Sequence, residues 1–476
     1  MIGRVIFLEN SPNTKEFWFV ANTSINLGDF VKADNVVAKV VEIVSANKYY
    51  SNIFSVKEFF DSGKDIKDLL PVDKWDVILA KARNICLLEN GEIKGVNKVV
   101  RVGSIVEYLE KENVEKVLGL DKNGIHIGYI KSNNVDVKLN IDKLFRKHCA
   151  IIAQSGYGKS YTVQVMLEEF LKSENKFPAI LIIDTHGEYK HFQNYFPQKF
   201  KNFSIEEVRF AVYNLSEERI YEVLPELTEV GKRELKKIVR NLKEKKKIFD
   251  FNDLILEVER SRINENVKAP MLSSLENLAL TNLFDKVSFP VLEEEVKPSK
   301  ILNFDISQTT SLRKKQTFVS LLLRNLFNLR IANKIPPAII FIEESHQFAP
   351  EQEDKFNALS KGIIETIARE GRKFGLSLVL ISQRPIQLSK TALSQCDTKI
   401  IMHLSNPYDI DHVGRSVEQL SSEELSMLTS LSIGEAFVCG EVVRFPILVK
   451  IKEKTISSAI SKSFSDLISE FENSYF

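Results

Sequence analysis

The sequence predicts an α/β protein with a parallel sheet, a small N-terminal β-barrel and a helical insertion. Three observations carry this prediction. Continuous apolar runs alternate with helical stretches from about residue 116 on, which is typical of strands covered on both faces. Short β-like runs separated by turn residues fill the chain before that point. Between about residues 204 and 296 the alternation stops, and amphipathic helical patterns follow one another.

The size and charge of the chain limit what it can be. At 476 residues it is too long for one ordinary core, so we expect two or three domains. It is 44% hydrophobic and 27% charged, the profile of a folded protein rather than a fibrous or disordered one. Because the formal net charge is only +1, a nucleic-acid ligand would need a locally basic surface such as a ring or channel.

Residues 1–115 are predicted to form the barrel, which we interpret as an assembly or partner-docking domain because they contain no catalytic constellation. Turn residues lie at Asn10 to Asn13, at Gly28-Asp29 and at Asn90-Gly91. The strand-like runs between them are IGRVIFLEN, EFWFVAN, NVVAKVVEIVS, DVILAKARNICLLEN and KVVRVGSIVEYL.

The parallel sheet and its helices are predicted from residues 116–203 and 297–452, with the helical insertion at residues 204–296. The basic run KEKKK (243–247) in the insertion is either a DNA contact or, as we favour, a solvated helix end. In residues 453–476 the apolar side chains are spaced as on one face of a helix, which predicts a short amphipathic C-terminal helix. The predicted strands are CAIIA (149–153), AILIID (179–184), KILNFDI (300–306), AIIFIEE (338–344), SLVLIS (377–382) and TKIIMHL (398–404).

Composition and hydropathy predict a cytoplasmic protein. The N-terminal apolar run is too short for a signal peptide, and no run approaches the ~18–20 apolar residues that a membrane span requires. The four cysteines never occur as CxxC, so we interpret them as buried apolar residues in a reducing compartment. They are Cys86, Cys149, Cys396 and Cys439.

The stretch IIAQSGYGKSYT (151–162) predicts a phosphate-binding loop between a strand and a helix. Its glycines let the backbone approach the phosphates, Lys159 supplies a positive charge, and the Ser160 hydroxyl could bind Mg²⁺. Ala153 stands where the usual pattern has its first glycine, at the strand end, so it removes no donor and no charge. We therefore predict an ATP site with Mg²⁺ at Gln154, Ser155, Gly156, Tyr157, Gly158, Lys159, Ser160 and Tyr161.

A second element, PPAIIFIEESHQF (336–348), predicts an apolar strand that ends in two carboxylates. Ligands of open α/β sheets lie at this carboxyl edge. Glu343 could hold the Mg²⁺ shell through water, although many enzymes with such loops have aspartate there. Glu344 could polarise the attacking water, the task that separates hydrolysis from binding.

A third element, IIETIAREGRKFGLSLVLISQRP (363–385), gathers candidate groups for the terminal phosphate. Arg369 and Arg372 are three residues apart and would share a helix face, where two like charges favour an anionic partner. Gln383 follows a strand and fits a sensor of the γ-phosphate or of the lytic water. Arg384 and the two helical arginines fit charge stabilisation of the transition state, worth ~10³–10⁵ in rate when supplied as a finger.

These motifs together resemble the HerA-like ATPases, relatives of the FtsK and conjugation-coupling DNA pumps. MIGRVIFLEN and GDFVKADNVVAKVVEI are similar to the family's N-terminal barrel, which is shared with rotary ATP synthases. The departures are Ala153, Tyr157 in place of a small residue and Ser345 in place of alanine. The resemblance covers nearly the whole chain, through AQSGYGKS, LIIDTHGEY, FIEESHQF, IAREGRKFG, SQRP and SQCDTKIIMHLSNPYD.

The resemblance implies a RecA-like P-loop core and a homohexameric ring with ATP between subunits and duplex DNA in the central channel. A neighbour's Arg369 or Arg372 would complete each site, and Arg146, shortly before the loop strand, is a further candidate. Asp184, which ends a strand with His186 and Glu188 just beyond it, would lie beside the metal. The sequence does not rank the arginines, and it leaves six against seven subunits open.

The resemblance also implies an effector protein docked on the barrel, either a nuclease or a sirtuin-like enzyme. Archaeal family members pair with the NurA nuclease in DNA end resection, and short bacterial members accompany effectors in anti-phage defence. The Lys-, Asn- and Ile-rich composition favours the defence setting. Two alternatives to a DNA motor stay open: an ATP-binding scaffold ring that switches its effector with little translocation, and a protein-remodelling ATPase.

Overall fold

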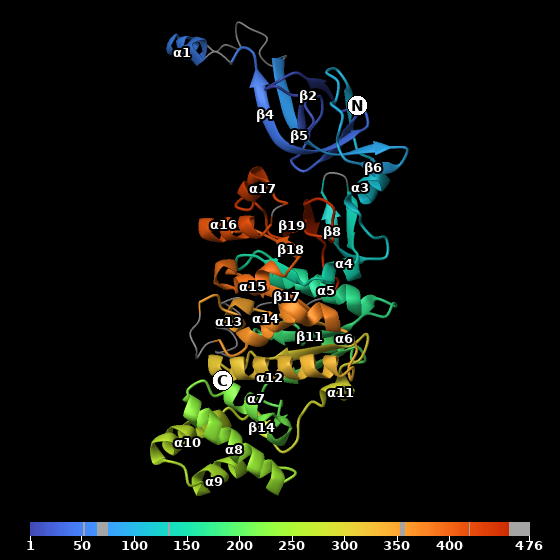
Figure 1. The fold of residues 1–476 in the computed structure, drawn as a ribbon. Coiled ribbons are helices and arrows are strands. Elements are labelled where there is room, and N and C mark those ends of the chain that lie inside the picture. Colours follow the sequence, from blue (N-terminus) through green and yellow to red (C-terminus); the bar gives the residue numbers. More distant parts are fainter. Residues whose placement is uncertain (51–52, 64–74, 132–133, 353–357, 418, 457–476) are drawn as a thin grey trace, which may run out of the picture. The chain divides into compact units, whose positions relative to one another are not determined.

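The computed structural model describes residues 1–50, 53–63, 75–131, 134–352, 358–417 and 419–456. It confirms the predicted fold class: a parallel sheet with flanking helices, an N-terminal barrel and a helical insertion (Figure 1). The chain forms two compact units. The first contains residues 1–140 and 417–452, and the second contains residues 141–416 with the described residues from Glu453 on.

Six antiparallel strands close the N-terminal barrel. They pair in the order β2-β1-β7-β3-β4-β5, and β2 also pairs with β5, which closes the ring. Fully buried side chains such as Phe17, Phe19 and Val31 fill the interior. The strands are β1 (Gly3–Ile6), β2 (Glu16–Ala21), β3 (Phe30–Ala33), β4 (Val36–Asn47), β5 (Asp76–Glu89) and β7 (Ile105–Tyr108); β6 (Glu92–Lys94) extends β5 as a hairpin, and helix α1 is Ile53–Asp61.

A second, antiparallel group of strands completes the first unit. Its strands pair in the order β19-β20-β8-β9. Two of them come before the parallel sheet in the chain, β8 (Ile125–Ile130) and β9 (Val135–Leu139), and two come after it, β19 (Glu435–Cys439) and β20 (Ile447–Ile451). A buried ion pair joins Lys39 on β4 to Glu424 on α17 (Ser422–Met427), with Nζ and Oε1 2.5 Å apart. The compact units therefore divide at residues 140 and 416, whereas the predicted domain limits at residues 115 and 452 remain a prediction.

The second unit is built on a parallel sheet of order β12-β15-β11-β16-β17-β10-β18. All six predicted strands are present, and their residues are almost completely buried, as continuous apolar runs require. The strands are β10 (Cys149–Ile152), β11 (Ala179–Asp184), β12 (Phe200–Ser204), β15 (Ile301–Asp305), β16 (Ala338–Ile342), β17 (Leu376–Ser382) and β18 (Thr398–Ile401).

Helices connect these parallel strands, as crossovers between parallel neighbours must. Three helices follow strand ends at the sheet edge that carries the predicted site: α5 (Lys159–Lys172) after β10, α13 (Ser345–Phe348) after β16 and α16 (Pro407–Ser416) after β18. The longest, α12 (Leu312–Ile331), packs with α14 (Lys361–Glu370), which also contacts β17. Other helices in the described part of the chain are α3 (Lys111–Leu118), α4 (Ile141–Phe145), α6 (Phe192–Tyr195), α11 (Leu292–Glu295) and α15 (Lys390–Ser394).

The helical insertion lies in the chain between β12 and β15. Its helices are α7 (Glu217–Glu222), α8 (Glu229–Lys245), α9 (Phe251–Arg260) and α10 (Glu265–Ala279), which pack as a cluster (Figure 1). In the KEKKK run, Lys245 pairs with Glu257 and Lys246 with Asp253, so these charges are compensated inside the insertion. Lys243 donates to the Leu215 carbonyl. These contacts support the interpretation of the run as a helix end.

The cysteines, the helix lengths and the last described residues bear on the remaining predictions from the sequence. All four cysteines are buried and free, as predicted. Among the described helices, none is long and apolar enough to cross a membrane. The predicted C-terminal helix lies largely at residues 457–476, outside the described residues. Just before it, Thr455 and Ile456 donate backbone hydrogen bonds to the buried Glu168 carboxylate on α5.

Candidate nucleotide site

A tight loop joins β10 to α5 and leaves open space beside its backbone. Gly156 and Gly158 have φ angles of +85° and +98°, a region that L side chains rarely adopt. A Cβ added to Gly156 would meet nothing within 4 Å, so this face of the loop is free for a ligand. Gly158 is the N-cap of α5, whose first N–H groups and dipole favour an anion. The loop therefore fits the phosphates of ATP.

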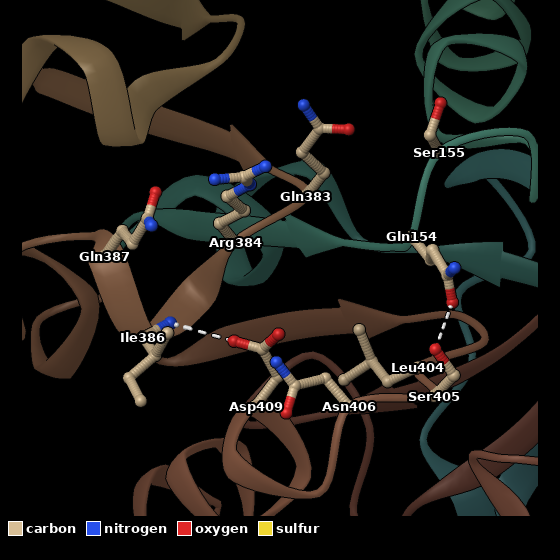
Figure 2. Close-up of a pocket in the computed structure, with 10 residues that line it drawn as sticks. All are labelled: Gln154, Ser155, Gln383, Arg384, Ile386, Gln387, Leu404, Ser405, Asn406 and Asp409. Carbon is tan, nitrogen blue, oxygen red and sulfur yellow. Dashed lines mark hydrogen bonds between the residues drawn. The ribbon is translucent and has the colours of Figure 1, made fainter.

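The residues that depart from the usual loop pattern have structural roles. Ala153, the residue after β10, is fully buried, and its N–H donates to the Ser382 carbonyl (3.3 Å) at the end of β17, so it lies outside the cradle. The Tyr157 ring stacks on His403 with centroids 3.8 Å apart and planes 6° apart. Gln154 accepts a hydrogen bond from Ser405 Oγ (2.7 Å; Figure 2). Residues that follow β18 thus hold the outer side of the loop.

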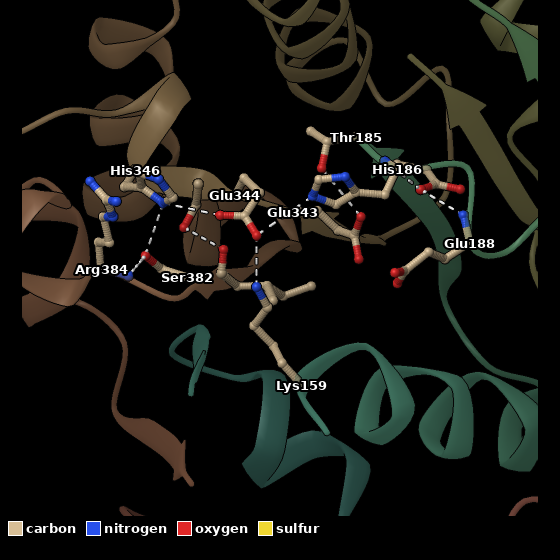
Figure 3. Close-up of polar contacts among 12 residues, drawn as sticks. Lys159, Thr185, His186, Glu188, Glu343, Glu344, His346, Ser382 and Arg384 are labelled. Atoms are coloured by element: carbon tan, nitrogen blue, oxygen red, sulfur yellow. Dashed lines mark hydrogen bonds and ion pairs between the residues drawn. The ribbon is translucent and has the colours of Figure 1, made fainter. Parts of the chain in front are cut away.

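Lys159 and Glu344 form an ion pair at the centre of the site (Figure 3). Nζ and Oε1 are 2.7 Å apart, and the two side chains are only 11% and 4% exposed. Glu344 is the N-cap of α13 in a left-handed conformation (φ 45°, ψ 42°), a strain typical of functional positions. Burial raises the pKa of Glu344, but the hydrogen bond from His186 and the charge of Lys159 outweigh burial and lower it to about 2. The carboxylate is therefore ionised near neutral pH.

The residues predicted to surround Mg²⁺ lie next to this pair. Asp184 accepts backbone N–H bonds from residues 186–189 and a bond from Asn303 Nδ2 (3.1 Å), so both of its oxygens are engaged. Glu343 accepts a hydrogen bond from the Tyr189 hydroxyl, and Thr185 Oγ1 lies 3.4 Å from its other oxygen. Burial and the neighbouring Asp184 raise the pKa of Glu343 to about 8.

The side chains beside the phosphate loop fit an Mg²⁺ ion that is bound mainly by the nucleotide. Within the part of the chain that the structure describes, no group of three or more His, Cys, Asp and Glu side chains could hold a metal ion. Ser160, in the first turn of α5, is the one predicted ligand at the mouth of the phosphate loop. An Mg²⁺ ion here would be bound by Ser160 and phosphate oxygens, with Glu343 behind them, which suits an ion that keeps several waters.

A polar hollow of about 410 Å³ opens beside the start of the loop (Figure 2). Gln383 and Arg384, which follow β17, line it together with Gln154 and Ser155. Asp409 accepts a hydrogen bond from the Ile386 N–H (3.2 Å) and so holds the segment after Arg384. The predicted sensor residue and one predicted arginine thus share the carboxyl edge of the sheet with the phosphate loop.

The other predicted arginines lie away from this edge. Arg146 and Arg372 line a separate hollow of about 330 Å³ with Ala338 and Leu376, which are the first residues of β16 and β17. This hollow is at the amino edge of the sheet. Arg369 lies in the last turn of α14, 3.8 Å from Glu365, whereas Arg372 lies in the 3₁₀ turn Gly371–Phe374. One protomer does not bring these three arginines to Lys159.

Comparisons with known proteins find similarity to HerA helicases. Residues 125–326 match the family model described as the central domain of helicase HerA. The DNA double-strand break repair helicase HerA of Saccharolobus solfataricus is 28% identical over 484 residues, covering 95% of this chain and 92% of that protein. This chain is thus similar to HerA helicases over nearly its whole length, and its residues 125–326 match the HerA central domain.

Two further comparisons agree with this similarity. The DNA double-strand break repair helicase HerA of Pyrococcus furiosus is 26% identical over 93% of this chain and 90% of that protein. The structure of VirB4 of Thermoanaerobacter pseudethanolicus has a TM-score of 0.56 at 17% identity, covering 70% of this chain and 98% of that one. At that identity the likeness to VirB4 concerns the fold alone.

Three residues of this site were not singled out in the sequence. Tyr189 bonds Glu343, Asn303 bonds Asp184, and His346 lies between Glu344 and Ser382. Tyr189 and His346 are inside the quoted motifs LIIDTHGEY and FIEESHQF, so the motifs located them without assigning a role. Asn303 follows apolar residues in β15 and carries no motif; a polar residue inside a buried strand was its only signal.

Replacing Gly156 by alanine is expected to weaken ATP binding at least about tenfold, because the new Cβ combines an unfavourable positive φ with loss of the open space beside the loop. Titration with a fluorescent ATP analogue measures the Kd. Ala153→Gly is the matched control, and its Kd should stay within about twofold of the parent protein because residue 153 is buried at the end of β10, away from the phosphates. Equal losses of ATP affinity in the two variants would contradict the placement of Gly156 at the phosphates and of Ala153 away from them.

Proposed function

We propose that this HerA-like protein is an ATP-hydrolysing, ring-forming DNA translocase. The observation that carries the proposal is the Lys159–Glu344 pair beside the glycine cradle. A module that only bound nucleotide would need the cradle and the lysine. An ionised carboxylate buried at the same point is the additional group that hydrolysis requires.

The reaction follows from the contacts of these two side chains. The loop N–H groups and the start of α5 would bind the phosphates, and Lys159 would turn from Glu344 to the β- and γ-phosphates. Glu344 Oε1, released from Lys159, would then orient the attacking water. Gln383 would contact the γ-phosphate or that water. Ser160 would hold Mg²⁺, with Glu343 and Asp184 behind it, and the ion would supply neutralisation of the phosphate charge.

The positions of the arginines favour sites that are shared between subunits. Arg146 and Arg372 lie at the amino edge of their own sheet, while the phosphate loop lies at the carboxyl edge. They cannot complete the site of their own protomer, but a neighbour in a ring could use them. We therefore propose a homohexamer in which Arg146, Arg369 or Arg372 acts in trans and Arg384 acts within the protomer.

Duplex DNA through the ring channel is the proposed polymer substrate. The relatives from Saccharolobus solfataricus and Pyrococcus furiosus are both named as DNA double-strand break repair helicases, which supports DNA as the ligand. We also propose that a nuclease or sirtuin-like effector docks on the barrel of the cytoplasmic ring. The names of the relatives favour DNA repair, a setting in which we propose a NurA-like nuclease as the effector, whereas composition alone favours anti-phage defence.

Glu344→Gln is expected to lower kcat for ATP hydrolysis by ~10²–10⁴, because a neutral amide cannot accept a proton from water. ATP binding should be retained or tightened, because the amide no longer competes for Lys159. Steady-state hydrolysis with and without long duplex DNA, together with nucleotide titration, measures both effects. The parent protein should be stimulated by the duplex.

Two outcomes would contradict the motor. If no duplex DNA stimulates ATP hydrolysis, duplex DNA is not the substrate of the proposed motor. If the Glu344→Gln ring keeps full effector activity, the scaffold alternative is favoured. Lys159→Ala is the control for nucleotide dependence, since it should lose binding as well as turnover.

Mixing two inactive variants tests the shared site. Arg372→Ala and Lys159→Ala should each hydrolyse ATP at least ~10³-fold more slowly than the parent protein. After co-assembly, about a quarter of the interfaces in a random ring would pair an intact Lys159 with an intact Arg372, so activity should return. The same mixture with Arg146→Ala or Arg369→Ala ranks the three arginines. If none of the three arginine variants recovers ATPase activity when it is mixed with Lys159→Ala, none of these arginines acts in the site of a neighbouring subunit.

A further inference from the structure

Two side-chain contacts join the turn that carries Glu344 to the end of β17. Ser345, fully buried, donates from Oγ to the Ile381 carbonyl (3.0 Å). The next residue, His346, contacts Ser382 Oγ through Nδ1 (3.2 Å; Figure 3). The turn after β16 is therefore fastened to the last two residues of β17, immediately before the predicted sensor Gln383.

The His346 ring lies between Ser382 and the carboxylate of Glu344. Its Nδ1 is 3.4 Å from Glu344 Oε2, and the side chain is only 9% exposed. Ser382 Oγ also accepts a hydrogen bond from the Arg384 N–H (3.1 Å). The contacts thus run from the backbone beside Gln383, through Ser382 and His346, to the carboxylate of Glu344.

The two oxygens of Glu344 have different surroundings. Oε1 faces Lys159 and hence the phosphate site. Oε2 is buried and accepts no hydrogen bond from any residue that the structure describes. Leaving a buried acceptor unpaired is unfavourable, which favours the tautomer of His346 with its proton on Nδ1, 3.4 Å from Oε2, as the donor to this oxygen. A bond at Oε2 would also fix the direction in which Oε1 points.

We propose that His346 is a positioning residue that holds Glu344 Oε2 after ATP has drawn Lys159 away, so that Oε1 faces the attacking water. The bridge through Ser382 ties this orientation to the end of β17, where Gln383 lies. His346 acts through Glu344 and need not contact ATP. The inference rests on the proposed ATP hydrolysis and names a residue that controls its chemical step.

A second buried histidine shows what a purely structural contact to β17 looks like. His148 accepts the Leu378 N–H at Nδ1 (2.9 Å), and its Nε2 lies 2.9 Å from the Ala368 carbonyl. Both ring nitrogens of His148 are bonded to backbone groups, far from the carboxyl edge of the sheet. His346 differs because its Nδ1 faces the side chain of the hydrolytic carboxylate.

Substitutions that keep or remove a donor at Nδ1 test the proposal. Asparagine can place its amide group near the position of Nδ1, whereas glutamine reaches toward Nε2 and alanine provides neither. His346→Ala and His346→Gln should lower kcat about 10- to 100-fold with the KM for ATP within about twofold, the pattern of lost orientation rather than lost binding. His346→Asn should recover most of the kcat. Melting temperatures are measured alongside.

Two further variants separate positioning from stability. Ser382→Ala should lower kcat less than His346→Ala, and the double variant should be no slower than His346→Ala, because both changes break one bridge. His148→Asn should lower the melting temperature and leave kcat per folded protein unchanged.

The outcomes are distinguishable. A parent protein without ATPase activity overturns the proposed function and this inference with it. An active parent protein overturns the inference alone if His346→Ala keeps full kcat, or if His346→Asn is as slow as His346→Ala.

Discussion

The ion pair between Lys159 and Glu344 is the interaction on which the site depends. It joins the first residue of α5 to the turn after β16, 2.7 Å apart and largely removed from water. The parallel sheet makes this contact possible, because β10 and β16 both end at the same edge with β17 between them. Two buried charges stabilise each other only as a pair. A triphosphate that attracts Lys159 must therefore also release Glu344, which links binding to the activation of the carboxylate.

The surrounding contacts keep this pair in one geometry. Stacking of Tyr157 on His403 holds the loop from one side, and the bonds of Ser345 and His346 to β17 hold the carboxylate from the other. The positive φ of Glu344 is maintained by these links rather than by local preference. Tyr157 and Ser345 are two of the three positions where the sequence departs from the HerA-like pattern, and each makes a specific contact in this chain.

Much of the fold could be predicted from the sequence because buried parallel strands are continuous apolar runs, as in AILIID and AIIFI. The strand β12, FKNFS, escaped prediction because it is an edge strand with exposed Lys201. Motif spacing also predicted Lys159, Glu344 and Gln383, since each follows a strand of known direction. It could not show that the N–H groups of residues 186–189 occupy Asp184, or that Arg146 and Arg372 meet at the opposite edge. Those facts depend on turn geometry and on tertiary contacts.

A high-resolution structure of the assembled protein with Mg²⁺ and a non-hydrolysable ATP analogue tests the central claim most directly. The account predicts Lys159 Nζ within hydrogen-bond distance of the phosphates, Glu344 Oε1 turned toward the γ-phosphate, and an arginine of the neighbouring subunit at the same phosphate. A structure in which the nucleotide is bound while Lys159 still pairs with Glu344, and in which the pocket faces solvent with no neighbouring arginine, would contradict it.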